Sequence, residues 1–393
     1  MQGQLVETEV EVDPAAELSG VYRYVGAGGT VKRPTRTNGP AMLFKNLKGH
    51  PGASAAIGVL ASRERVARLL GCAKEDLGRL LCESVASPIA PVLDESPAPC
   101  QEVVHLASEP DFDLFRLLPA PTNTPVDAGP YITLGMCYAT HPDTGCSDVT
   151  IHRLCIQGRD ELSIAGAIRG EPVRLCRCVS VAERAIAHAE FVIEGEIVPG
   201  VRVQEDQHSG TGFAMPEFPG YNGVASSECW LLKVKALTHR RAPILQTCIG
   251  PSEEHVNMAG IPTEASILGM LERAMPGRVK NVCAHRSGGG KYMAILQMCK
   301  KAPTDEGRQR QAALLAFSAF PELKHVVLAV REAPLSAVHL RNMYELARFG
   351  AVVFPPVPAW YAKPQSLEEA ERQIAARILA QFGVEAPGAP CWG

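Results

Sequence analysis

The sequence predicts an α/β protein with a strand-rich middle, and three observations lead to this fold class. Between residues 102 and 230, β-branched runs follow one another and are separated by Gly, Pro and Asp. Helical spacing of apolar residues occurs before this stretch, at 62–81, and after it, at 264–274 and 305–317. Short β-branched runs between turn residues indicate strands, and apolar residues three and four apart indicate amphipathic helices.

The first hundred residues mix both kinds of element. Residues 5–12 alternate apolar and polar side chains, which predicts a half-buried strand, and residues 41–46 (AMLFKN) predict a buried strand. Residues 62–81 predict a helix, and the Pro-rich stretch 87–99 predicts a connection. The apolar positions of that helix are Val66, Leu69, Leu70 and Leu77.

The middle stretch contains six strand-like runs: EVVHL, YITLGMCYA, VTIHRLCI, PVRLCRCV, EFVIEGEIV and ECWLLKVKAL. They predict one compact strand-rich domain. Beyond it, MAILQMC and HVVLAV predict two further strands. The final helix is expected over 366–382, with Ser366 as its cap, Glu369 three residues later and Gly383 after its end. We therefore expect four parts: 1–100, 101–240, 241–330 and 331–393.

Composition excludes several classes of protein. The chain of 393 residues is 46% hydrophobic and 21% charged with a formal net charge of -3, as in ordinary globular proteins, so no nucleic-acid or anionic-membrane surface is expected. The first residues are acidic and resemble no signal peptide, and no apolar window approaches the roughly 18 residues of a membrane span. The thirteen cysteines are scattered, which predicts reduced structural thiols and a cytoplasmic location.

Chemistry-bearing residues gather in the strand-rich middle. In SDVTIHRLCI (147–156), alternation along a strand places Asp148 and His152 on one side and Arg153 on the other, so only a turn or bulge would bring Asp148 and Arg153 together. Further on, Glu217 lies between two prolines in FAMPEFPGYNG. A rigid, partly apolar loop of this kind raises the pKa of a carboxyl group toward the range useful for proton donation. A solvated turn glutamate is the alternative interpretation.

These segments resemble UbiD-type decarboxylases over about residues 3–330, through GQLVETEVEVDP, DAGP, AGAIRGEPV, EFVIEGEI and PEFPGY in that order. The resemblance implies a split-barrel-like flavin-binding middle domain. It also implies non-oxidative decarboxylation of an aromatic or α,β-unsaturated acid with prenylated FMN, a divalent metal (manganese or magnesium) and potassium. By resemblance, Arg153 lies beside the flavin and the substrate carboxylate, and Glu217 protonates the product. Asp148 falls where the family has a metal-ligating, cofactor-side asparagine, and Glu161 matches a metal-ligating glutamate.

The sequence departs from the family in two places. The family has a second glutamate five residues before the proton donor, where this chain has Gly212; Glu205 is a candidate replacement. Only seven residues separate Arg153 from Glu161. In the family this interval is a long segment that includes a metal-binding histidine, a role that His152 does not match. The resemblance therefore predicts an incomplete metal site.

The end of the chain resembles a different family. Residues 331–364 and the helix after them are similar to the C-terminal part of UbiX-type flavin prenyltransferases, which make prenylated FMN. The resemblance implies a prenyl-phosphate site at Arg331, Glu332, Tyr361 and Arg377. The Gly/Ser-rich loop that binds the FMN phosphate in that family is absent, and GAGG (26–29) and SGGG (287–290) lie in UbiD-like sequence.

The leading hypothesis is a UbiD-like carboxy-lyase that acts on a small carboxylic acid as a homo-oligomer and receives its cofactor from a flavin prenyltransferase. The alternatives are a UbiX-like prenyltransferase and an inactive fused or truncated product. The junction at residues 330–331 has two explanations, coding stretches removed as introns or a fusion that lost pieces. We expect Arg153 and Glu217 to share one cleft. We also expect the UbiX-like segment to pack against the body or to stay loosely ordered, and to transfer no prenyl group.

Overall fold

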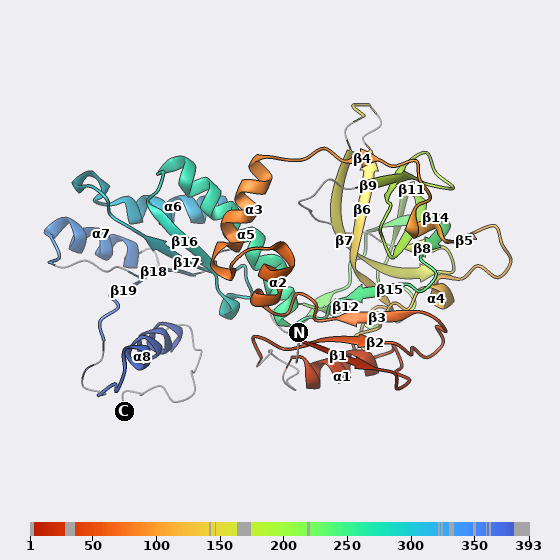
Figure 1. Ribbon diagram of the computed structural model, residues 1–393, viewed down its shortest axis with the longest axis horizontal. Helices are drawn as coiled ribbons and strands as arrows, with labels where there is room; N and C mark the ends of the chain where they lie inside the picture. The colour runs from red at the N-terminus through yellow and green to blue at the C-terminus, as the bar shows by residue number, and fades with distance from the viewer. Residues whose placement is uncertain are drawn as a thin grey trace. The chain divides into compact units, whose positions relative to one another are not determined.

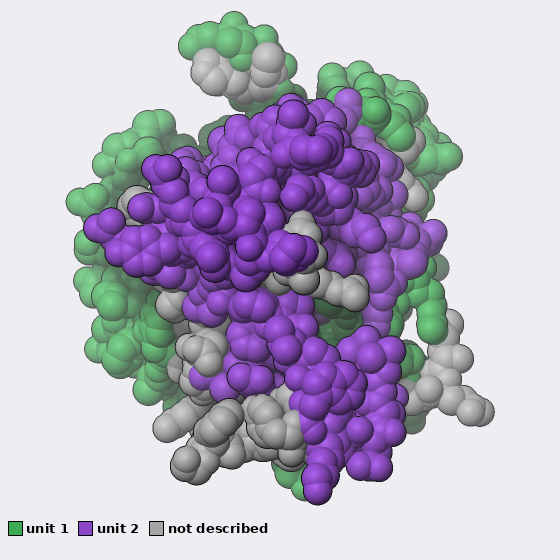
Figure 2. Space-filling model, turned by 90° about the vertical axis from the view of Figure 1, so that its left-hand side faces the viewer, with its two compact units in different colours: residues 1–69, 87–255 green, residues 70–86, 256–393 purple. Residues whose placement is uncertain are grey.

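The computed structural model describes residues 4–27, 36–140, 143–145, 147–162, 174–217, 221–320, 323, 325–329, 334–348, 351–358, 360 and 363–380. The chain forms two compact units, coloured separately in Figure 2. Unit 1 contains residues 1–69 and 87–255, and unit 2 contains residues 70–86 and 256–393.

The start of the chain builds a small sheet in unit 1, with strand order β1-β2-β3-β15. Helix α1 (Glu17–Val25) packs on it through Leu18 and Tyr22, which are buried in one core with Phe44 and Ile57. The strands expected at 5–12 and 41–46 are confirmed, in shortened form. The sheet consists of β1 (Leu5–Thr8), β2 (Ala41–Phe44), β3 (Ser54–Ile57) and β15 (Ile244–Thr247).

The middle of the chain is rich in strands, as predicted (Figure 1). Its main sheet has the order β11-β14-β8-β7-β6, with β5 paired to β14. Among the described residues the outer strands β11 and β6 are not paired with each other, so the sheet stays open and no barrel closes. The strands are β5 (Val103–Leu106), β6 (Tyr131–Thr140), β7 (Ser147–Gly158), β8 (Glu161–Leu162), β11 (Phe191–Val203) and β14 (Cys229–His239).

Two smaller groups of strands and a short helix complete unit 1. The three-stranded sheet is β10-β9-β4, and β12 pairs with β13. Asp113 caps the start of helix α4 (Leu114–Leu117), because its side chain accepts a hydrogen bond from the Phe115 N–H at 3.0 Å. The strands are β4 (Val92–Leu93), β9 (Arg174–Arg177), β10 (Arg184–Ile186), β12 (Phe213–Pro216) and β13 (Asn222–Val224).

Strand β7 separates the core of the main sheet from the candidate site. Leu154 and Ile156 are buried in the core with residues such as Leu237. Arg153 and Cys155 lie on the opposite face, because successive side chains of a strand point to opposite sides. One strand thus supplies both a hydrophobic core and a polar site.

The single helix expected over 62–81 is two helices, α2 (Arg63–Leu70) and α3 (Leu77–Ala86). Gly71 lies between them with φ of 72°, a left-handed conformation that glycine adopts without strain and that ends helices. The break turns Leu69 and Leu70 outward, with 63% and 48% of each exposed. Apolar periodicity alone did not reveal this break.

Unit 2 contains a four-stranded sheet with the order β16-β17-β18-β19. Its core combines Ile267 and Leu271 of α5 with Leu296 of β17 and Ala313 of α6. The strands are β16 (Val279–Ala284), β17 (Met293–Met298), β18 (His325–Ala329) and β19 (Val352–Phe354). The helices are α5 (Glu253–Ala274), α6 (Arg308–Ala319), α7 (Ala337–Arg348) and α8 (Leu367–Ala380).

The UbiX-like segment, residues 331–385, contributes β19 to the sheet of unit 2, which confirms that it packs against the UbiD-like body. Strand β19 pairs in parallel with β18, and Leu346 and Ala351 are buried in the core of unit 2. His339 of α7 lies 2.7 Å from Glu306 through Nε2 and Oε2, and its Nδ1 accepts a hydrogen bond from the Ser336 N–H at 2.9 Å. The predicted cap of α8 is also present, because the Glu369 N–H donates to Ser366 Oγ at 3.1 Å.

Two expectations from composition concern the whole chain. The cysteines that the structure describes form no disulfide bonds. In the part of the chain that the structure describes, every helix is too short or too polar to span a bilayer.

Candidate active site

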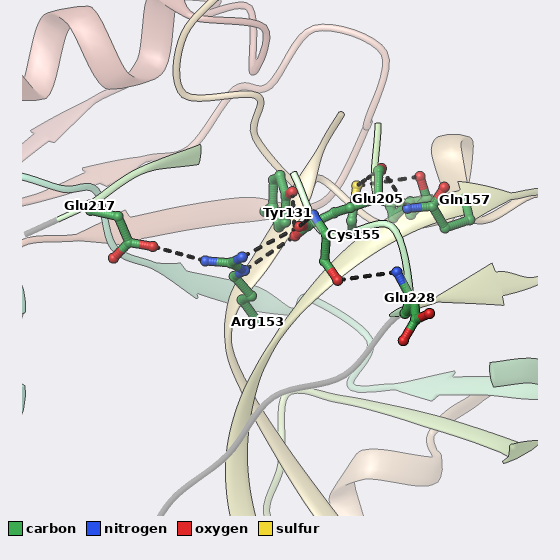
Figure 3. A network of polar contacts seen from close by, with 9 residues as sticks. Tyr131, Arg153, Cys155, Gln157, Glu205, Glu217 and Glu228 are labelled. Atoms are coloured by element: carbon green, nitrogen blue, oxygen red, sulfur yellow. Dashed lines mark hydrogen bonds and ion pairs between the residues drawn. The ribbon is translucent and has the colours of Figure 1, made fainter. Parts of the chain in front are cut away.

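Arg153 of β7 is the centre of a polar network in unit 1 (Figure 3). Its Nη1 donates to Glu217 Oε1 at 3.0 Å. On the other side, its Nε lies 3.2 Å from Glu205 Oε1 and its Nη2 donates to Glu205 Oε2 at 3.4 Å. The guanidinium is therefore held between two carboxylates, and the predicted pair Arg153 and Glu217 is brought together.

Glu205 is the buried member of this network, with 3% of its side chain exposed. The Tyr131 hydroxyl donates to Oε1 at 2.8 Å, and the Ser226 N–H donates to Oε2 at 3.0 Å. Its backbone carbonyl accepts a hydrogen bond from Gln157 Nε2 at 2.9 Å. Each carboxylate oxygen thus has one donor from the scaffold and one contact with Arg153.

Glu217 follows the end of β12 and is more accessible, with 28% of its side chain exposed. Its N–H donates to the Tyr221 carbonyl at 2.8 Å. Two glycines make room for it. A Cβ at Gly250 would lie 2.4 Å from the Pro216 carbonyl oxygen, and one at Gly223 would lie 3.0 Å from Glu217 Oε1. The backbone around Glu217 is therefore packed tightly, and a side chain at either glycine would crowd this segment.

The charges around Arg153 favour its cationic form. Burial acts to lower the pKa of Arg153, but Glu205, Tyr131 and Glu217 outweigh burial, and the pKa is raised. Burial, together with the charge of Glu205, raises the pKa of Tyr131, so the phenol stays protonated and donates. Burial and the adjacent guanidinium lower the pKa of His152 to about 4, so this imidazole is neutral at pH 7.

The backbone of Asp148 lies in β7 and that of Glu161 in β8, while both side chains fall outside what the structure describes. The ladder between β6 and β7 is regular from Ser147 to His152, and its irregularity lies between Ile132 and Gly135 on β6. Strand β7 therefore has no bulge between Asp148 and Arg153 that would bring the two residues to the same side of the strand.

The two expected metal ligands are far apart in this backbone. Glu161 pairs with Gly158, and Asp148 lies ten positions before Gly158 on the same strand. At about 3.3 Å per residue the two positions are roughly 30 Å apart, too far to bind one ion. Within the described part of the chain, no three His, Cys, Asp or Glu side chains could hold a metal ion together.

Gly212 shows why the second glutamate is not at the family position. Its φ is 77°, which strains any residue with a side chain, and its N–H donates to Asp206 Oδ2 at 2.7 Å. Glu205 contacts Arg153 instead. Sequence reasoning named Glu205 only as a replacement and missed Tyr131, although an aromatic hydroxyl directly after the DAGP motif was visible.

Of the four prenyl-phosphate residues expected by resemblance, the structure describes one. Arg331, Glu332 and Tyr361 lie outside the described residues. Arg377 lies on α8, with its guanidinium carbon 5.8 Å from the centre of the Phe354 ring.

The donors of Arg153 fit a flavin cofactor and an acid substrate. A guanidinium has five N–H donors, and the two carboxylates engage at most three of them. With 32% of the Arg153 side chain exposed, the remaining donors can reach a bound group.

Models of known domain families match most of the chain, between residue 1 and residue 348. The 3-octaprenyl-4-hydroxybenzoate carboxy-lyase N-terminal domain matches residues 1–85, and the C-terminal domain of the same family matches residues 256–348. The Rift-related domain between them matches in two pieces, 92–163 and 157–253.

Individual relatives agree with this assignment. Gallate decarboxylase of Lactiplantibacillus plantarum is 47% identical over 378 residues, which cover 82% of this chain and 77% of that enzyme. The apo structure of 3,4-dihydroxybenzoic acid decarboxylase from Enterobacter cloacae has a TM-score of 0.78 at 46% identity and covers 88% of this chain and 82% of its own. An evolved dimeric form of the UbiD-class enzyme HmfF from Pelotomaculum thermopropionicum, in complex with prFMN, has a TM-score of 0.72 at 27% identity, with 88% and 86% covered.

A short similarity to a second family is also present. A probable UbiX-like flavin prenyltransferase of Streptomyces sp. is 48% identical over 71 residues, which are 18% of this chain and 36% of that protein. This match spans about a third of the prenyltransferase, whereas the UbiD domains follow one another from residue 1 to residue 348. The chain belongs to the UbiD family of prenylated-FMN-dependent carboxy-lyases.

Proposed function

We propose that this protein decarboxylates a hydroxylated aromatic acid of the gallate and 3,4-dihydroxybenzoate class. The observation that carries the proposal is the contact between Arg153 and Glu217, which places a guanidinium and a carboxyl group side by side. The similarity to gallate decarboxylase and to 3,4-dihydroxybenzoic acid decarboxylase supports the substrate class.

In the proposed reaction the bond between the ring carbon and the carboxyl group breaks, and CO₂ leaves. Prenylated FMN supplies an electron sink for the electron pair that remains. Arg153 binds and orients the substrate carboxylate through its free N–H donors. Glu217 then delivers one proton to the ring carbon, so no net oxidation or reduction occurs. Glu205, itself buried, keeps the guanidinium oriented in place of the family's second glutamate.

The divalent metal (manganese or magnesium), the potassium ion and their proposed ligands Asp148 and Glu161 rest on the family resemblance alone. The described backbone keeps these two positions about 30 Å apart, by ten residues of β7 at the usual strand rise, which is too far for one shared ion. We therefore assign no catalytic step to a metal. A cytoplasmic location, a homo-oligomer and cofactor supply by a flavin prenyltransferase are further parts of the proposal.

For residues 331–385 we propose a structural role. These residues resemble the end of a UbiX-type enzyme, and β19 completes the sheet of unit 2 while Leu346 fills its core. The two-piece match to the Rift-related domain, which meets at residues 157–163, supports an internal segment being lost there. Both a gene-structure error and a degraded fusion fit these facts, and sequencing the transcript separates them.

The function is tested by co-expressing the chain with an intact flavin prenyltransferase. The purified protein should carry prenylated FMN by mass spectrometry and release CO₂ from gallate or 3,4-dihydroxybenzoate. In D₂O the product should contain one deuterium at the former carboxyl position. Cinnamate serves as an α,β-unsaturated control substrate. Bound flavin without turnover of any of these acids would overturn the proposed reaction, and turnover of cinnamate alone would overturn the substrate class.

A further inference from the structure

The carboxylate of Glu205 has a side-chain hydrogen-bond donor that no role above requires. Tyr131 is fully buried, and its hydroxyl donates to the same Oε1 that faces Arg153 Nε. The other scaffold donor is the backbone N–H of Ser226. Among the described residues, Tyr131 is thus the side chain besides Arg153 that fixes the Glu205 carboxylate.

The ring of Tyr131 is rigidly placed. The ring packs in a small core with Ala128, Cys155 and Met215. The backbone N–H of Tyr131 donates to the Pro121 carbonyl at 2.9 Å. A carboxylate with one donor per oxygen cannot rotate about its last torsion without losing both bonds. Its two contacts with Arg153 therefore hold the guanidinium plane, and the third contact, Nη1 to Glu217, depends on that plane.

We infer that Tyr131 is a positioning residue that acts through Glu205 to aim Arg153 at Glu217 and the substrate carboxylate. This inference rests on the proposed function for its catalytic consequence. A hydroxyl that matters only for packing would change stability, whereas a positioning hydroxyl changes catalysis only while Glu205 is present to transmit its effect.

The test is a double-mutant cycle of Tyr131→Phe and Glu205→Leu in the flavin-loaded protein. Tyr131→Phe should keep the bound flavin and lower kcat/KM by about tenfold, since small misplacements in a site are costly. In the Glu205→Leu background, where no acceptor for the Tyr131 hydroxyl is left at this position, Tyr131→Phe should have no further effect, because residues that act through one another are not additive. Tyr22→Phe, which removes a buried phenol elsewhere in unit 1, should leave kcat/KM unchanged in both backgrounds.

A second measurement does not require activity. Phenylglyoxal modifies accessible guanidinium groups, and peptide mass mapping gives the rate at Arg153. This rate should rise in Tyr131→Phe and stay unchanged in Tyr22→Phe. An unchanged rate, or additive losses of kcat/KM in the cycle, would overturn the inference. A wild-type protein that turns over no acid, yet shows the faster modification in Tyr131→Phe, would overturn the proposed function alone.

Discussion

Nη1 of Arg153 and Oε1 of Glu217 are 3.0 Å apart although 64 positions separate the two residues in the chain. The contact joins the middle of a long strand to the residue after a short one. It is the relationship on which the proposed chemistry depends.

Replacing Glu217 with Gln should abolish decarboxylation and leave the bound flavin in place, because the amide keeps the shape of the side chain and cannot deliver the proton. Turnover and the flavin absorption spectrum of the purified variant measure the two effects. Glu228→Gln is a matched control, since the Glu228 side chain is exposed near the network. Loss of flavin from Glu217→Gln would show that this glutamate supports the structure instead.

Replacing Arg153 with Lys should lower kcat/KM by about 100-fold. An ammonium group keeps the charge but cannot contact both carboxylates and a substrate in one plane. Steady-state kinetics on the flavin-loaded variant measure the loss. Arg174→Lys, at a position with 63% of the side chain exposed, should behave as wild type. Full activity of Arg153→Lys would mean that charge alone is needed at this position.

Ionisation of the Glu254 carboxyl group should make unit 1 less stable as the pH rises. Burial raises the pKa of this carboxyl to about 7 against the pull of the Gly58 and Leu60 N–H groups, which donate to it at 2.7 and 2.9 Å. The folded protein therefore holds a proton that the unfolded chain releases near pH 4.5. Its contribution to the free energy of unfolding is complete below pH 4.5 and declines by about 3 kcal/mol as pH rises through 7.

Thermal unfolding between pH 5 and 8 checks this dependence. Glu254→Gln cannot ionise, so its melting temperature should fall less over this range than that of wild type. Glu83→Gln, at an exposed position on α3, should follow the wild-type curve. Parallel curves for Glu254→Gln and wild type would contradict the raised pKa.

His339→Ala should destabilise unit 2 by about 1–3 kcal/mol, because it removes the contact with the Glu306 carboxylate and leaves the Ser336 N–H without its acceptor. Thermal melting or limited proteolysis followed by mass spectrometry would locate the effect. An unchanged melting temperature would show that the segment after residue 331 contributes little to the fold.

The protein should not transfer a prenyl group. A strand and two helices from the end of a prenyltransferase lack the backbone N–H groups that bind the FMN phosphate. Incubation with reduced FMN and dimethylallyl phosphate, followed by flavin mass, tests this directly beside an intact prenyltransferase. A prenylated flavin formed by this chain would favour the prenyltransferase hypothesis.

Much of the local structure follows from the sequence. Alternation predicted the strand-rich middle, and a serine and a glutamate three residues apart predicted the start of the last helix. These features depend on neighbouring residues, so short stretches of sequence determine them. The motifs around Arg153 and Glu217 predicted the family.

The tertiary structure decided which residues complete the site. Glu205 contacts Arg153 although 52 positions separate them, and Tyr131 contacts Glu205 across 74 positions of the chain. The β7–β8 pairing likewise separated Asp148 from Glu161. Such contacts depend on strand register and on long-range packing, which residue spacing along the chain does not contain.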